Sequence, residues 1–141
     1  MSRAKKVTAF LNAAQFAQTL GLTCAIHGDE MTSTLPFQEK LIGNPTIRAL
    51  HGGAIGAFLE VTAMAQLYLV TDLMRPPKPI DLTVDYLRSG KAIDTFARAT
   101  VRKLGSRMAS VYAEAWQSDR DKPVAALRAQ FLVDVDESSA D

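Results

Sequence analysis

The chain has 141 residues, 48% hydrophobic and 22% charged, which is the length and composition of one ordinary globular domain. Its 16 basic and 15 acidic side chains give a net charge of +1, which provides no field for nonspecific nucleic-acid binding. The single cysteine, Cys24, excludes an intrachain disulfide, and with only two histidines a protein-only zinc site is disfavoured. We therefore expect one domain without a metal, located in the cytoplasm.

Residues 1–21 are predicted to form an amphipathic helix from Val7 to Leu20, ended by Gly21. The basic start, with no acidic residue before Asp29, also fits an amphipathic transit peptide. We favour a surface helix, because transit peptides are usually richer in serine and arginine. The apolar residues at helical spacing are Val7, Phe10, Ala14, Ala17 and Leu20.

The next segment contains two short strand candidates, residues 22–28 and 31–37, joined by a turn at 28–30. We expect residues 38–50 to be a loop, because Gly43, Asn44 and Pro45 interrupt any regular pattern.

The most apolar stretch, Gly53–Met74, is predicted to be one long helix that ends before Pro76. A helix apolar nearly all round is either buried or spans a membrane. Its apolar run falls short of about 20 residues and contains Glu60, so we expect a buried central helix and no membrane span.

From Ile80 onward the pattern changes to alternating strands, which we place at residues 80–87, 92–104, 107–118 and 123–135. Because short turns join these consecutive strands, we expect neighbours to pair antiparallel. The sequence thus predicts an α+β fold over residues 22–134, with an antiparallel sheet curled around the long helix. Residues 135–141 are expected to be a disordered acidic tail.

Leu50-His51-Gly52-Gly53 stands where the loop meets the long helix. Unpaired N–H groups at a helix start form an anion or oxyanion site, and glycines let a ligand approach the backbone closely. The alternative is that the two glycines only fit a tight joint between loop and helix.

Glu60 is the second chemical feature of this helix, because a carboxylate in an apolar setting must be paired or have a shifted pKa. A structural salt bridge is the alternative, but no lysine or arginine lies between Arg48 and Arg75. Glu60 follows His51 by nine residues, roughly 13–14 Å along a helix. If both features act in catalysis, they must come from two antiparallel helices of a two-fold dimer.

The stretch LHGGAIGAFLEVTAMAQ resembles the helix motif of hotdog-fold acyl-CoA thioesterases of the phenylacetate-degradation and 4-hydroxybenzoyl-CoA types. These enzymes have His-Gly-Gly followed by an acidic residue nine positions after the histidine, as His51 and Glu60 stand here. IDLTVDYLRSG and VRKLGSRMASVYAEAW are similar to strands of that family, and the resemblance extends from Leu22 to Val133.

The resemblance implies hydrolysis of an acyl-CoA thioester by a dimer or a dimer of dimers, with coenzyme A as part of the substrate and no other cofactor. It implies that the Gly52 N–H polarises the thioester carbonyl, that His51 orients the thioester or a water, and that Glu60 of the opposite subunit acts as nucleophile or general base. Gly53 and Asn44 are the neighbouring substrate-binding candidates, although Asn44 stands one residue further from the histidine than in the family.

The family's hydroxyl at the start of the next strand is replaced here by Pro79, which leaves Thr62 and Thr83 as substitutes. The candidates for holding the phosphates of coenzyme A lie in or beside turns of the later strands: Arg88, Arg102, Lys103 and Arg107. Ordinary solvated charge is the alternative for each of them.

Two further functions stay open. EVTAMAQ resembles the helix of acyl-carrier-protein dehydratases, but their upstream histidine is absent, with Thr46 and Ile47 in that region. A non-enzymatic acyl-CoA binding module on the same fold is the other alternative.

Overall fold

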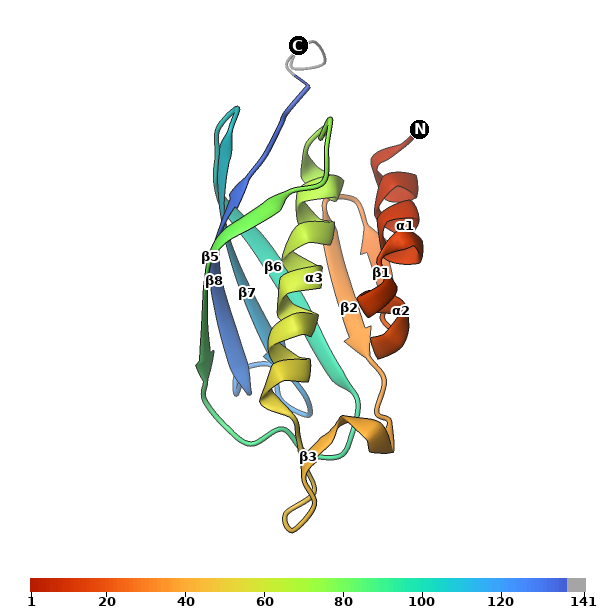
Figure 1. The fold of residues 1–141 in the computed structure, drawn as a ribbon, viewed down its shortest axis with the longest axis vertical. Coiled ribbons are helices and arrows are strands. Elements are labelled where there is room, and N and C mark those ends of the chain that lie inside the picture. The colour runs from red at the N-terminus through yellow and green to blue at the C-terminus, as the bar shows by residue number, and fades with distance from the viewer. Residues whose placement is uncertain (137–141) are drawn as a thin grey trace.

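The computed structural model describes residues 1–136, which form one large sheet, a small two-stranded hairpin, one long helix and two N-terminal helices (Figure 1). The elements in chain order are α1 (Arg3–Ala13), α2 (Gln15–Leu20), β1 (Thr23–His27), β2 (Glu30–Leu35), β3 (Ile42–Asn44), β4 (Ala49–Leu50), α3 (Gly52–Val70), β5 (Lys78–Tyr86), β6 (Thr95–Leu104), β7 (Met108–Trp116) and β8 (Ala125–Leu132).

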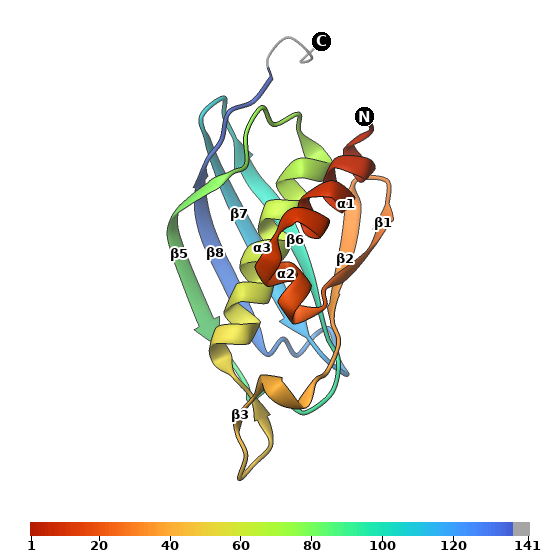
Figure 2. The same cartoon turned by 45° about the vertical axis from the view of Figure 1, so that its right-hand side comes forward.

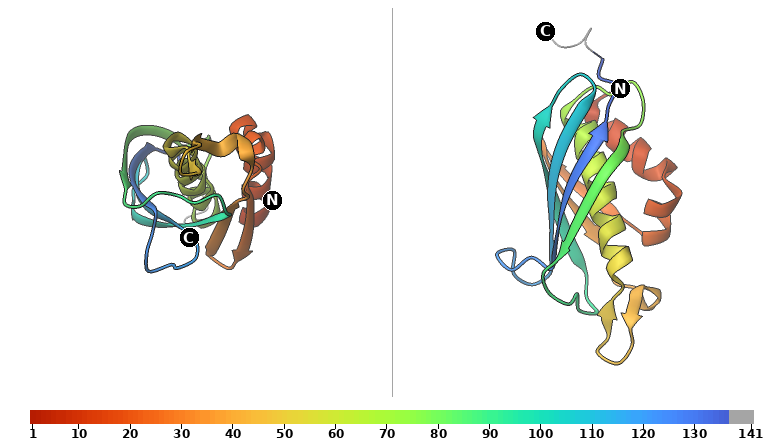
Figure 3. Two further views of the ribbon diagram at one scale, coloured as in Figure 1. Left: turned by 90° about the horizontal axis from the view of Figure 1, so that it is seen from below. Right: turned by 60° about the vertical axis from the view of Figure 1, so that its left-hand side comes forward.

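The main sheet is antiparallel and has six strands in the order β1-β2-β6-β7-β8-β5. Seen along α3, the strands curl around the helix, as predicted from the sequence (Figure 3, left). The expectation that all consecutive late strands pair was wrong for β5 and β6. β5 pairs instead with β8, from Lys78↔Leu132 to Tyr86↔Ala125, and forms the end of the sheet.

The core fills the space between the concave face of the sheet and α3. Because strand side chains alternate, small residues of β6, β7 and β8 face the helix and leave room for its large side chains. Phe58, Leu59 and Leu67 of α3 are fully buried there, as is Phe131 of β8. α3 meets the length and composition of a membrane-spanning helix, but 56% of that span is buried inside the fold, in agreement with the expected central helix.

The N-terminal segment forms two helices, not the single helix predicted from Val7 to Leu20. The chain breaks at Ala14, which is extended (φ −77°, ψ 105°), and Gly21 ends α2 in the left-handed region (φ 71°) as expected. Val7 and Leu11 of α1 and Ala17 of α2 belong to a second apolar cluster with buried residues of α3. Figure 2 shows α1 and α2 lying across the side of α3 that the strands leave open.

Residues 38–50 are more ordered than the predicted loop. A 3₁₀ turn (Glu39–Leu41) leads into a small hairpin, in which Ile42 pairs with Leu50 and Asn44 with Ala49. Strands of three and two residues are too short to give a periodic signal in the sequence.

α3 begins at Gly52 and ends at Val70, four residues before the predicted end at Met74. The segment after it is held by the chain's C-terminal part. Leu73 bridges to Val135, and the Asp136 N–H donates to the Asp72 carbonyl at 2.7 Å. The expected disorder is therefore wrong for residues 135 and 136, and the rest of the tail lies outside the described residues.

β5 has an unusual surface for an edge strand. Its large apolar side chains Ile80, Leu82 and Tyr86 are 48%, 39% and 55% exposed, although they belong to the apolar set of the alternating pattern. One edge of β5 has no strand partner among the described residues. An exposed, apolar edge strand is a template for pairing with another strand.

The first prediction follows from the burial of α3. Phe58→Ala should lower the free energy of unfolding by about 3–5 kcal/mol, because it leaves a cavity in the core. Phe16→Ala is the matched control, since Phe16 is 53% exposed and its loss should change the unfolding free energy by only about 0.5 kcal/mol. Denaturant titration measures both, and equal effects would contradict the described packing.

Candidate active site

The start of α3 leaves one backbone N–H without an internal acceptor. His51 caps the helix: its Nδ1 accepts the Gly53 N–H at 2.9 Å, and its carbonyl accepts the N–H groups of Ala54 and Ile55 at 3.0 and 3.3 Å. The Ile55 bond is the first regular bond of the helix. Of the four N–H groups that precede it, three have acceptors: His51 donates to the Leu41 carbonyl, Gly53 to Nδ1 and Ala54 to the His51 carbonyl. No acceptor for the Gly52 N–H is found within residues 1–136. Gly52 therefore presents the free donor at the positive end of the helix.

The cap also determines which nitrogen of the neutral His51 ring carries the proton. Because Nδ1 accepts a hydrogen bond it carries no proton, so a neutral ring carries its proton on Nε2. The exposed ring can then donate from Nε2 to a carbonyl or a water.

The backbone of His51 is held by the preceding segment. Its N–H donates to the Leu41 carbonyl at 2.7 Å. Gly43 passes so close that a Cβ there would lie 2.7 Å from the His51 Cα, a distance that real Cβ atoms do not show. Gly43 is therefore required to place His51.

Tyr86 covers the other side of the helix start. Its hydroxyl donates to the Gly52 carbonyl at 2.8 Å. A Cβ on Gly52 would lie 3.2 Å from the Tyr86 ring, and one on Gly56 would lie 3.2 Å from its hydroxyl oxygen. The two glycines thus let the edge strand β5 close over the first turns of α3.

Glu60 is a half-buried carboxylate without a partner. It has neither a salt bridge nor a side-chain hydrogen bond within the part of the chain that the structure describes. Burial raises the pKa of the Glu60 carboxyl above its ordinary value. The structural salt bridge considered from the sequence is therefore absent in this range. A desolvated carboxylate with a raised pKa is typical of a general base or nucleophile.

The remaining predicted site residues divide into those near His51 and those far from it. Gly53 lies beside the His51 ring, but its N–H is taken by Nδ1. Asn44 uses its side-chain oxygen to accept the Thr46 N–H at 3.1 Å, which stabilises the exposed β3–β4 turn. A substrate contact by Asn44 stays a prediction.

Arg88 lies next to the helix start. The Leu50 N–H donates to the Gly90 carbonyl at 2.9 Å, so the turn that follows β5 adjoins α3. Gly52, Tyr86 and Arg88 line one cavity of about 340 Å³. The Arg88 guanidinium also donates to the Pro123 carbonyl at 2.6 Å.

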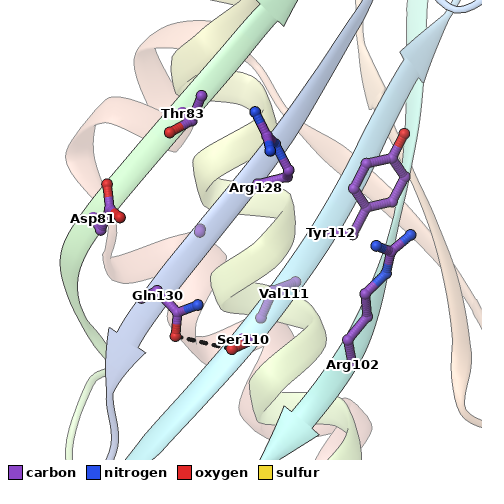
Figure 4. A pocket seen from close by; sticks show the side chains of 9 residues that line it. Asp81, Thr83, Arg102, Ser110, Val111, Tyr112, Arg128 and Gln130 are labelled. Atoms are coloured by element: carbon purple, nitrogen blue, oxygen red, sulfur yellow. Dashed lines mark hydrogen bonds between the residues drawn. The ribbon is translucent and has the colours of Figure 1, made fainter.

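The other three basic candidates lie elsewhere in the protomer. Lys103 and Arg107 lie at the turn between β6 and β7, at the opposite end of the molecule from the start of α3 (Figure 1). Arg102 stacks on the Tyr112 ring at 4.2 Å, on the face of the sheet turned away from α3 (Figure 4). That face carries a polar hollow of about 310 Å³, where Ser110 donates to Gln130 at 2.8 Å. One protomer does not bring these three residues to His51.

Neither threonine considered as a substitute for the hydroxyl expected at the start of β5 has its own hydroxyl free near the helix start. The Thr62 hydroxyl is buried and donates to the Phe58 carbonyl at 2.8 Å within the helix. Thr83 points to the outer face of the sheet (Figure 4). Pro79, at the start of β5, offers no hydroxyl. Over residues 1–136, no group of three or more His, Cys, Asp or Glu side chains is arranged to hold a metal ion.

A curled antiparallel sheet wrapped around a long central helix is the hotdog fold. Residues 43–132 match the acyl-CoA thioesterase N-terminal domain family, and the chain belongs to that family. No curated relative matches the sequence.

Solved structures agree with this fold. The chain is similar to a protein from Chromobacterium violaceum at 38% identity, covering 92% of this chain and 91% of that one, with a TM-score of 0.73. The PaaI protein of the E. coli phenylacetic acid degradation operon is 20% identical over 93% and 92% of the two chains, with a TM-score of 0.80. A thioesterase family protein from Silicibacter pomeroyi is 19% identical over 96% and 100%, also at 0.80.

Two residues that shape this site were not singled out from the sequence. Gly43 stands in the segment predicted as a loop, where a glycine indicates only a turn. Tyr86 fits the apolar face of its strand, so alternation predicts packing and not a hydrogen bond to Gly52. Both roles depend on contacts between distant segments.

The close approach of Gly43 makes a second prediction. Gly43→Ala should displace His51 and lower kcat/KM on a thioester substrate roughly 100-fold, because small misplacements of catalytic groups are this costly. Gly105→Ala is the control, since a Cβ there meets its nearest atom at an ordinary 3.4 Å. Full activity of Gly43→Ala would show that His51 does not need its present position.

Proposed function

We propose that this protein hydrolyses an acyl-CoA thioester to the free acid and coenzyme A. The single observation that carries the proposal is the free Gly52 N–H at the histidine-capped start of α3, on the same helix as the unpaired Glu60. Membership of the acyl-CoA thioesterase family supports the same reaction.

Each group has a defined task in the proposed reaction. The Gly52 N–H donates to the thioester carbonyl oxygen, where negative charge develops in the transition state. His51 donates from Nε2 to the substrate or to a water and keeps it in place. The Glu60 carboxylate either takes a proton from the attacking water or attacks the carbonyl carbon itself. In both cases the carbon–sulfur bond breaks, one water is consumed, and the thiolate leaves as coenzyme A after gaining a proton.

A single protomer cannot assemble these groups. Gly52 and Glu60 are eight residues apart, about 12 Å along the helix, whereas both must reach one carbonyl group. Gly56 stands midway, four residues from each. If two α3 helices cross antiparallel near Gly56, the Gly52 of each helix faces the Glu60 of the other.

The surface around Gly56 supports such a dimer. The incompletely covered face of α3 carries small residues, so a second helix can approach closely. That face includes Gly53, Ala57, Glu60 and Met64, at spacings of three and four residues, whereas Tyr86 covers Gly56 itself. Beside it lie the exposed apolar side chains and the free edge of β5. Antiparallel pairing of β5 with its copy would bury this surface and join the two sheets.

The rest of the proposal concerns binding and assembly. Arg88, beside Gly52, is placed to bind a phosphate of coenzyme A, and Arg102, Lys103 and Arg107 are candidates only if another subunit brings them near. We also propose that the enzyme works in the cytoplasm, needs no cofactor and forms a dimer or a dimer of dimers.

Thioester hydrolysis is the third prediction. Thiol release from acetyl-, hexanoyl-, palmitoyl- and benzoyl-CoA should detect turnover by the wild type, and Glu60→Gln should lower it about 10²–10⁴-fold by removing the base or nucleophile. Absence of turnover on every thioester would refute the proposed function. Hydration of crotonyl-CoA, followed by ultraviolet absorbance, would favour a dehydratase instead.

The same experiment has a pH dependence with a defined sign. Catalysis needs the Glu60 carboxylate, so kcat/KM should fall as pH drops through the pKa of Glu60. Because burial raises that pKa, the acid limb should lie above the ordinary glutamate value of 4.5. An acid limb at or below that value would argue against Glu60 as the titrating group.

The shared site makes the fourth prediction. His51→Ala and Glu60→Gln should each be inactive, but a refolded equimolar mixture should regain about a quarter of wild-type activity. Half of the dimers are then mixed, and one of the two sites in each mixed dimer has both wild-type residues. Either variant refolded alone is the control. No recovery in confirmed mixed dimers would mean that both residues act from one chain.

A further inference from the structure

A second cavity lies on the opposite side of the α3 start from Tyr86 and Arg88. It has a volume of about 450 Å³ and brings together α2, the segment before β3, and the first turn of α3. Its walls include Phe16, Leu20, Leu41, Ile42, His51 and Ala54.

The lining of this cavity is mostly apolar. Leu20 and Leu41 are 2% and 5% exposed, so they form its buried base. Phe16 of α2 is 53% exposed and stands at its open side. Lys40 also borders it, and a lysine can line an apolar wall with its stem while its ammonium group stays in water. Such a lining favours an uncharged apolar group.

The two cavities match the two parts of an acyl-CoA molecule. His51 and Gly53 border the apolar cavity, whereas Gly52, Arg88 and Ser89 border the cavity on the other side. A thioester whose carbonyl oxygen accepts the Gly52 N–H lies between them. Its acyl group then extends toward α2, and its phosphate-bearing part extends toward Arg88.

We infer that α2 forms the wall of an acyl-binding pocket and that Phe16 is a specificity-determining residue for apolar acyl groups. This inference rests on the proposed thioesterase function. A benzene ring fits a cavity of roughly 150 Å³, so about 450 Å³ accommodates an aromatic ring or a six-carbon chain with room to spare. The substrate class is therefore an uncharged aryl or medium-length aliphatic acyl-CoA.

The test compares acyl preference, which a merely structural role of Phe16 would not change. We would measure kcat/KM for acetyl-, hexanoyl-, phenylacetyl- and glutaryl-CoA. The wild type should prefer hexanoyl- and phenylacetyl-CoA over acetyl-CoA by at least tenfold, since each buried methylene is worth about fourfold. Phe16→Ala should reduce this preference about tenfold, and Phe16→Leu should restore most of it.

Gln15→Ala is the matched control, because Gln15 is exposed on the same short helix and does not line the cavity. Its acyl preference should equal that of the wild type. An active wild type whose preference is unchanged by Phe16→Ala would overturn the pocket assignment and leave the proposed hydrolysis intact. Preference for glutaryl-CoA would also overturn it, because an anionic acyl end does not suit this lining. A wild type that hydrolyses no thioester would overturn both.

Discussion

The rigidity of α3 is the constraint on which the other features of this molecule depend. An α-helix rises about 1.5 Å per residue, so the backbones of Gly52 and Glu60 stay about 12 Å apart along the axis, and the Glu60 side chain is too short to span that separation. No loop movement brings them together, because both belong to the same buried element. A protomer therefore holds two half-sites, one at the start of the helix and one at its middle.

The protomer has an exposed apolar surface that suits the dimer which the separation of Gly52 and Glu60 requires. Apolar side chains on β5 remain in water, and small residues leave one face of α3 open. In a monomer this arrangement exposes apolar area and an unpaired strand edge to water, and neither contributes to stability. In the proposed dimer, the surface that stabilises the assembly also surrounds Glu60. The contact that joins the protomers would therefore desolvate the Glu60 carboxylate further and raise its pKa.

The sequence was most informative where a single segment carries the whole signal. The long apolar run predicted α3, and alternation predicted β5 to β8, because burial periodicity is local. His51, Gly52 and Glu60 were found for the same reason, since one helix holds all three. The break at Ala14, the pairing of β5 with β8 and the small β3–β4 hairpin were missed, because contacts between distant segments decide them. The positions of the basic residues relative to the helix start could not be predicted for the same reason: all four stand in or beside turns, but within one protomer only Arg88 lies next to the start of α3.

Tyr86 connects the proposed assembly to the proposed chemistry. It belongs to the edge strand that would pair with a second copy, and its hydroxyl holds the carbonyl of Gly52, whose N–H is the free donor. Glycines at 52 and 56 make room for its ring and hydroxyl, so β5 and the helix start behave as one unit. A shift of β5 on pairing would therefore act on the Gly52 carbonyl, which is joined to the Gly52 N–H through the same Cα. In the proposed dimer, assembly would then affect the site in two ways. Tyr86 would link the position of the Gly52 N–H to the pairing of β5, and the partner would contribute the carboxylate.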